Sequence, residues 1–378
     1  MTEPDDDRLR IMHGGPFYEL MARLGIRRRG WRALVLALLC WAVPVLLVLE
    51  TRGTDEAAVF LRDWGAWAKF LIAPVLLTLA EKPISFALDQ CLSILFRVPL
   101  VASQSAQDAR KALRDARDRT TAGMPELVCA ALACAATAFN AATFLGGGGP
   151  SWAIAGGAVS MTGLWCLVVG NTVYWFLMTR LVWKHIVWWR FLFSIGQCHL
   201  RLVATHPDGH AGLGFLGFYP AGYGLFTLAA GSVFAAGVGH VMQRDTVTPG
   251  LFTAVCGAWL AVVVIYYVLP LAGIAMQISR LKRKAVILSL SKVTDFERWN
   301  ERAVLGQNVF PDEAEPEANE IRDVKPIYLA SMKTSALLIN KGNLLQVLVP
   351  ALLPMLVVGV SYLPFSQLGP IVKRLLLL

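Results

Sequence analysis

The sequence lacks the charge that a water-soluble protein of this size carries. Only 16% of its 378 residues are Asp, Glu, Lys or Arg, and 56% are hydrophobic, whereas soluble domains carry about 25% charged residues. Charge is missing from several blocks that match the roughly 20 residues needed to cross a bilayer core of about 30 Å. Because backbone polar groups in lipid must be satisfied within a helix, the composition predicts an all-α membrane protein.

The sequence also lacks the patterns that mark most enzymes and metal proteins. None of the seven cysteines forms a CxxC pair, so neither a disulfide framework nor a thiolate metal cluster is indicated. No serine-hydrolase elbow, HExxH zinc motif, phosphate-binding loop or kinase signature is present. We therefore predict no catalytic residue, no metal and no cofactor, and we favour a protein that is not an enzyme.

About seven transmembrane helices are expected, or six if the short second block does not span. Long helices would satisfy the backbone hydrogen bonds of these blocks. Some of these helices would continue beyond the membrane into the cytoplasm. The predicted spans are 31–49, 64–80, 125–145, 153–178, 218–242, 251–276 and 344–363.

The distribution of Lys and Arg predicts the orientation of these spans. Most of the 35 basic residues lie before the first span and in every second loop, and basic loops remain in the cytoplasm. The N-terminus is therefore expected in the cytoplasm. The sequence is therefore divided into four parts. The first is a cytoplasmic segment (1–30), and the second is a membrane domain with six spans (31–276) and cytoplasmic helices near 82–120 and 180–205. The third is a cytoplasmic helical segment (277–343) with an acidic linker (311–323), and the fourth is a C-terminal span with an interfacial tail (344–378).

Small and polar residues within the spans indicate helix packing. Gly156, Gly157, Gly231 and Gly237 would let helices approach closely, and buried amides such as Asn140 and Asn171 usually join helices by hydrogen bonds. This favours a homo-oligomer. The net charge of +9 is spread over loops beside the membrane, so it fits the bilayer and its anionic lipids better than nucleic acid.

Special residues gather most densely in one predicted cytoplasmic loop, at 205–218. His199, His206, Asp208 and His210 could meet around a metal ion, but their spacing matches no recognised metal motif. The alternative is structural: Pro207 and Asp208 form a turn, and Asp208 caps the helix of the fifth span. We favour the turn, and we keep the loop as a place where a ligand or partner would bind.

Three stretches around this loop, and a fourth upstream, carry a resemblance. They are 183–191, with Trp188-Trp189-Arg190-Phe191; 200–208, ending in Thr205-His206-Pro207-Asp208; 212–217, Gly-Leu-Gly-Phe-Leu-Gly; and 74–81, ending in Glu81. Together they resemble a family of bacterial inner-membrane proteins that has no established activity. The resemblance covers most of 70–218 and implies a membrane location, but it implies no substrate. The chain departs from the family pattern at Gly209-His210-Ala211, where a basic residue and a second glycine are usual.

Two functions are compatible with these features. The first is a transport or channel-like unit for ions or small solutes, since ionisable residues at membrane helices often serve ion pathways. The second is a signalling or assembly protein whose cytoplasmic helices bind a protein partner. For Glu81, an ion or proton site competes with a helix-end ion pair beside a proline kink. The candidate contact residues are Glu81, Arg190, Arg201, His206, Asp208 and His210.

Overall fold

The structure, a computed structural model, is almost entirely helical and confirms the all-α membrane fold. It describes residues 14–26, 28–310, 322–363, 369 and 375. Seven of the described helices are long and apolar enough to cross a membrane, as the sequence predicts. They are Arg29–Arg62, Trp64–Arg97, Gly123–Gly146, Met161–Ile195, Gly214–Arg244, Pro249–Leu305 and Lys341–Tyr362.

Every described span except the last, which is α14 alone, is built from consecutive helical segments that include a wider π-helical or tighter 3₁₀ stretch. The segments of the first four spans, with the helices that precede or join them, are α1 (Pro16–Arg23), α2 (Arg29–Ala37), η2 (Leu38–Ala42), α3 (Val43–Arg62), α4 (Trp64–Ala66), η3 (Trp67–Ile72), α5 (Ala73–Arg97), η4 (Ser103–Ser105), α6 (Ala106–Thr121), α7 (Gly123–Thr143), η5 (Phe144–Gly148), η6 (Ser151–Ala153), β1 (Ile154–Ala155), β2 (Ala158–Val159), α8 (Met161–Trp165), η7 (Cys166–Asn171) and α9 (Thr172–Ile195). The remaining segments are η8 (Gly214–Tyr223), α10 (Gly224–Arg244), α11 (Pro249–Val268), η9 (Leu269–Leu271), α12 (Ala272–Leu305), α13 (Lys325–Lys333) and α14 (Lys341–Tyr362).

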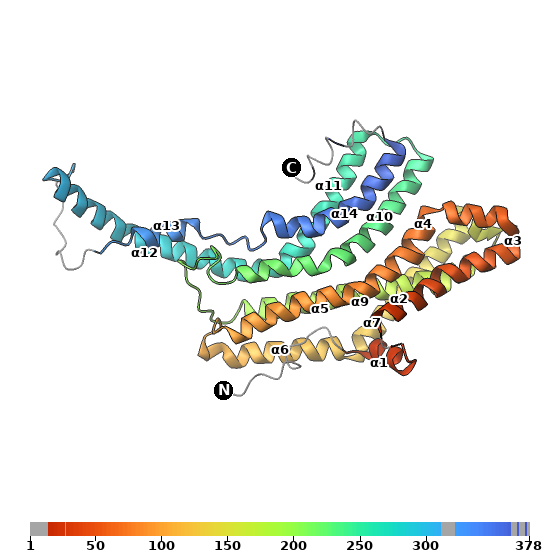
Figure 1. Ribbon diagram of the computed structural model, residues 1–378, viewed down its shortest axis with the longest axis horizontal. Helices are drawn as coiled ribbons and strands as arrows, with labels where there is room; N and C mark the ends of the chain where they lie inside the picture. Colours follow the sequence, from red (N-terminus) through yellow and green to blue (C-terminus); the bar gives the residue numbers. More distant parts are fainter. Residues whose placement is uncertain (1–13, 27, 311–321, 364–368, 370–374, 376–378) are drawn as a thin grey trace.

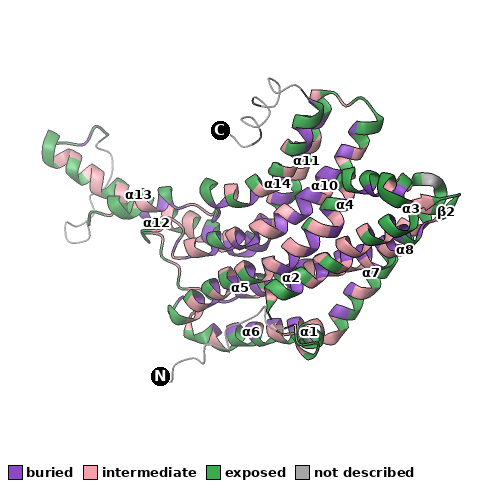
Figure 2. Cartoon of the chain, turned by 45° about the vertical axis from the view of Figure 1, so that its right-hand side comes forward, coloured by how far each residue is buried: buried purple, intermediate pink, exposed green. Residues whose placement is uncertain are grey.

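The spans form two packed groups (Figure 1). One group contains α2, α5, α7 and α9, with α6 lying along one side, and the other contains α10, α11 and α14. Helix α5 joins the groups because it packs against η8 and α10. Leu88 of α5, Trp188 of α9 and Met355 of α14 belong to one buried core, and Figure 2 shows the buried residues where the helices meet.

Close approach between α10 and α14 confirms one predicted packing glycine. A Cβ added to Gly231 would lie 2.8 Å from the carbonyl oxygen of Ala351. The prediction is wrong for Gly156 and Gly157, which have φ of 56° and 83° and connect β1 to β2 rather than lying within a span. A Cβ on Gly237 would meet no atom within 4 Å.

The predicted amide contact between the third and fourth spans is confirmed. Asn140 donates from Nδ2 to Asn171 Oδ1 at 3.3 Å, and Asn171 donates from Nδ2 to Thr137 Oγ1 at 2.9 Å. Side-chain hydrogen bonds therefore hold α7 against the fourth span within the predicted bilayer depth.

Several helix ends differ from those predicted. The second span does not end near Ala80, because α5 continues through Pro83 to Arg97; a proline removes one backbone bond but does not end a helix that is packed on other helices. The helix predicted near 180–205 ends at Ile195. The extension of the sixth span is confirmed, since α12 continues to Leu305 and ends at Gly306 with φ 81°. Residues 1–13, most of the acidic linker and most of the tail lie outside the described residues.

Candidate functional site

Five ionisable side chains from four spans lie together inside the bundle. Arg32 comes from α2, Glu81 from α5, Glu126 from α7, and Arg180 and Lys184 from α9. The three cationic side chains are each 3% exposed and Glu126 is 8% exposed. Buried charges are costly and rare, so a buried group of this size is a candidate functional site. We call these five residues the buried charge network.

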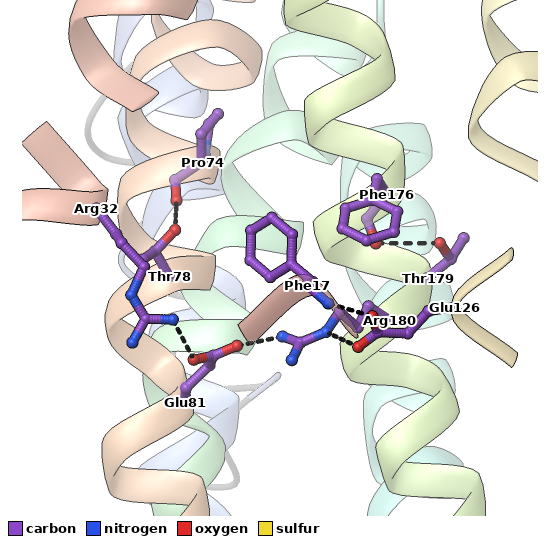
Figure 3. A network of polar contacts seen from close by, with 9 residues as sticks. All are labelled: Phe17, Arg32, Pro74, Thr78, Glu81, Glu126, Phe176, Thr179 and Arg180. Carbon is purple, nitrogen blue, oxygen red and sulfur yellow. Dashed lines mark hydrogen bonds and ion pairs between the residues drawn. The ribbon is translucent and has the colours of Figure 1, made fainter. Parts of the chain in front are cut away.

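Arg180 is the centre of the network (Figure 3). Its Nε donates to Glu126 Oε1 at 2.8 Å, and its Nη1 donates to Glu81 Oε1. One guanidinium thus bridges carboxylates from two other helices, because its donors are held in a rigid fork. The bridge joins α5, α7 and α9 across the interior of the bundle.

Lys184 and Arg32 complete the network. Lys184 lies one turn after Arg180 and interacts electrostatically with both Glu81 and Glu126. Arg32 forms an ion pair from Nη1 to Glu81 Oε2 at 3.6 Å, but its Nε and Nη1 make no hydrogen bond with any described residue. Two buried Arg32 nitrogens therefore retain hydrogen-bonding capacity. Buried polar atoms of this kind call for a partner such as an ion.

The short helix α1 covers the network. The backbone N–H of Phe17 donates to Glu126 Oε2 at 2.6 Å, and the Phe17 ring lies 5.0 Å from the Arg180 guanidinium carbon. The Tyr18 ring lies 5.4 Å from the corresponding carbon of Arg32. Both rings face cations, as expected for cation–π contacts. Helix α1 is thus bound to the network by its first turn.

A glycine permits this close approach. Gly15 has φ 108°, and a Cβ on it would lie 2.6 Å from Glu126 Oε1. Only glycine adopts this backbone conformation without strain. The sequence Gly15-Pro16-Phe17 therefore ends the entering chain, begins α1 and places the Phe17 N–H on the carboxylate.

Sequence reasoning found Glu81 but missed the other four members. Glu81 forms ion pairs, as one of its two interpretations expects, but with Arg32 and Arg180 from other spans, and it lies within α5 rather than at a helix end. Cations near the end of a span usually mark the lipid surface, yet Arg180 and Lys184 are both buried. A signal was present: neither has an acidic residue three or four positions away on its own helix, so any partner had to come from another span.

Asp208 organises the loop that follows α9. Its Oδ1 accepts from the backbone N–H of His210 at 2.8 Å and of Gly212 at 3.1 Å, and its Oδ2 accepts from that of Gly214 at 2.9 Å. His206 Nδ1 lies 2.9 Å from Oδ1. Burial alone would raise the pKa of Asp208, but these hydrogen bonds outweigh it and lower the pKa. The carboxylate shapes the turn that enters η8, in keeping with the structural interpretation.

The same loop binds the segment between α13 and α14. His210 Nδ1 lies 3.0 Å from the carbonyl oxygen of Ser335, and the Ser335 N–H donates to Gly209 at 2.9 Å. Thr334 Oγ1 donates to the carbonyl oxygen of Ala204 at 2.9 Å. The loop therefore joins the chain after α9 to the chain before α14.

The predicted contact residues do not form one site. Arg190, Arg201 and His206 are exposed, and Glu81 belongs to the buried charge network while Asp208 and His210 belong to the loop. Among the described residues there is no group of three or more His, Cys, Asp and Glu that could hold a metal. The structure thus separates Glu81 from the loop residues.

Comparison of the chain with protein families, with curated proteins and with solved structures finds no match. The chain is an integral membrane protein by the length and composition of its helices. Its function has to be inferred from the geometry of its own residues.

Proposed function

We propose that the protein moves ions or small solutes across the membrane, small anions in particular, and that the buried charge network is where the anion binds. The observation that carries the proposal is the pair of buried Arg32 nitrogens, Nε and Nη1, that make no hydrogen bond to described residues. Guanidinium groups bind carboxylate-like oxygens well and remain charged when buried. An anion beside Arg32 would accept hydrogen bonds from these two nitrogens.

Helix α1 supports a role in access. It contacts Arg32, Glu126 and Arg180 through only one turn, and none of its residues is fully buried, although Phe17 packs against the edge of the core. Short elements with few buried contacts open at low free-energy cost. Release of α1 would open the network on the side that α1 covers.

The test is anion flux into proteoliposomes that contain the full chain, with chloride, nitrate and acetate as probes. Arg32→Gln should lower flux about tenfold or more, since a hydrogen bond to a charged group is worth about 1.5–3 kcal/mol; Arg32→Lys should retain part of it. Phe17→Ala, which loosens α1 but leaves all five charges, should raise flux. Arg110→Gln, an exposed position on α6, is the charge-matched control.

Two outcomes would contradict transport. One is flux no greater than that of protein-free liposomes for all three anions. The other is equal flux in Arg32→Gln and Arg110→Gln, provided that thermal unfolding curves show both variants to be folded.

A second candidate function has its own observation. The far part of α12 extends beyond the bundle (Figure 1) and exposes Ile287 and Leu288, 63% and 71% accessible. The helix that α11, η9 and α12 form together, Pro249–Leu305, has 57 residues. It is longer than the roughly 20 residues that a bilayer requires. We propose as the alternative that this part docks a cytoplasmic protein. Cross-linking from Lys292 in cells would then recover one defined soluble protein, and recovery of self-links alone would contradict it.

We further propose that the protein belongs to the bacterial inner-membrane family that its loop sequence resembles. A cytoplasmic N-terminus, a homo-oligomer and contact with anionic lipids belong to the same proposal. Their support is the 205–217 motif, the basic residues in alternate loops and the bilayer-length helices.

A further inference from the structure

Two neighbouring hollows lie at the end of the bundle that contains Asp63, which we call the Asp63 end. The first, of about 370 Å³, is polar, and its lining includes Arg62, Asp63, Trp152, His240 and Arg244. The second, of about 280 Å³, is apolar, and its lining includes Trp64, Trp67, Leu228, Ala236 and Val357. None of these side chains belongs to the buried charge network.

The two hollows lie one after the other along α10, on either side of the close contact between Gly65 and His240, and we call them together the groove. Residues of α10 spaced by four lie on one helix face, and that face carries Leu228, Ser232 and Ala236 in the apolar hollow and then His240 and Arg244 in the polar one. The junction is tight, because a Cβ on Gly65 would lie 2.8 Å from His240 Cε1. Opposite α10, the chain passes from Asp63 in the polar hollow to Trp64 and Trp67 in the apolar one.

The one carboxylate of the polar hollow is already satisfied. Asp63 accepts from Trp152 Nε1 at 2.7 Å and from the Gly65 N–H at 2.7 Å, and its Oδ1 lies 3.0 Å from His240 Nε2. Burial raises the pKa of Asp63, but these bonds outweigh it and lower the pKa, so the group stays charged and paired. The exposed guanidiniums of Arg62 and Arg244 therefore dominate the mouth of the groove.

We propose that this groove binds one anionic phospholipid, with its phosphate at Arg62 and Arg244 and an acyl chain along Trp64, Trp67 and Val357. Charge complementarity selects the phosphate, and the apolar hollow continues from it toward the middle of α10 and α14. Tryptophans at this level fit the boundary between headgroups and acyl chains. The proposal does not depend on anion transport.

The test measures lipid retained by the purified full-length protein in detergent, by native mass spectrometry. The probes are phosphatidylglycerol, zwitterionic phosphatidylcholine and glycerol 3-phosphate. We expect phosphatidylglycerol to bind about tenfold more tightly than phosphatidylcholine, and the double variant Arg62→Gln, Arg244→Gln to abolish that preference. The control for charge is the double variant Arg110→Gln, Arg280→Gln at exposed positions outside both hollows.

A second pair of variants tests the acyl chain. Val357→Trp would fill the apolar hollow, and Val262→Trp places the same ring on the outward face of α11; the two valines are 48% and 57% exposed. Only Val357→Trp should reduce binding of phosphatidylglycerol. Equal binding of both lipids, an unchanged preference in the arginine variant, or equal losses in the two tryptophan variants would each overturn the proposal. Competition by glycerol 3-phosphate as strong as that by the lipid would instead indicate a free phosphate and would also overturn it.

Discussion

At the scale of single residues, the buried charge network stabilises the bundle only while each charge keeps its partners. Breaking a buried pair leaves an uncompensated charge and costs more than the pair contributes. Glu126 is the clearest case, because it accepts from both Arg180 and the backbone of Phe17. The network is therefore a single unit in which each position depends on the others.

Glu126→Gln should destabilise the protein by about 3–5 kcal/mol, since Arg180 loses one of its two carboxylates in a buried place. Glu19→Gln, on the exposed side of α1, is the matched control and should change stability by less than about 0.5 kcal/mol. Unfolding in mixed micelles measures both. Similar unfolding of the two variants would show that the charge of Glu126 is not needed.

Asp208 predicts a pH dependence with a defined sign. Its pKa is lowered in the fold, so its contribution is complete above the unfolded-state value of about 3.9 and is lost as pH falls through the lower folded value. Hydrogen exchange of the 205–214 loop should be equally protected at pH 7 and pH 5 relative to intrinsic rates, and should lose protection only below about pH 4. Asp208→Asn should remove this change. Loss of protection between pH 7 and pH 5 would contradict the assignment to Asp208.

At the scale of elements, α1 is bound to the buried charge network by the contacts of its first turn. Gly15→Ala adds a Cβ that would lie 2.6 Å from Glu126 Oε1, whereas Gly25→Ala adds one with no atom within 4 Å. Both glycines have positive φ, so both variants carry backbone strain of about 1–3 kcal/mol. Only Gly15→Ala should also displace α1 and make 14–23 sensitive to protease. Equal sensitivity of the two variants would assign the effect to strain alone.

The packing of α10 on α14 offers a second matched pair. Gly231→Ala would bring a Cβ within 2.8 Å of Ala351, and Gly237→Ala would meet nothing within 4 Å. Overpacking usually costs about 1–3 kcal/mol, while alanine in an open helix position gains about 1 kcal/mol over glycine. The two substitutions should therefore shift the unfolding temperature in opposite directions. A rise in both would show that the two helices separate easily.

At the scale of the whole molecule, the spans could be predicted because each is a continuous apolar block. The helix ends could not, since packing rather than propensity carries α5 through Pro83. The Asp208 turn could be anticipated because its partners lie within six residues. The network could not, because Arg180 meets Glu81 and Glu126 from 99 and 54 residues away, and periodicity within one helix says nothing about which other helix it faces.

The seven-span order makes a prediction about sides. One span separates Thr246 from Lys292, and four separate Gln107 from Lys292. Cysteines placed at these exposed positions, in a chain with Cys134→Ser, should therefore divide into two groups. With a cytoplasmic N-terminus, an impermeant maleimide should label Thr246→Cys in intact bacterial cells, and should label Gln107→Cys and Lys292→Cys only after the membrane is opened. The reverse pattern would invert the orientation but keep the span order. Labelling of Thr246→Cys and Lys292→Cys from the same side would mean that the helix from Pro249 to Leu305 does not cross the membrane, which its apolar first half makes energetically costly.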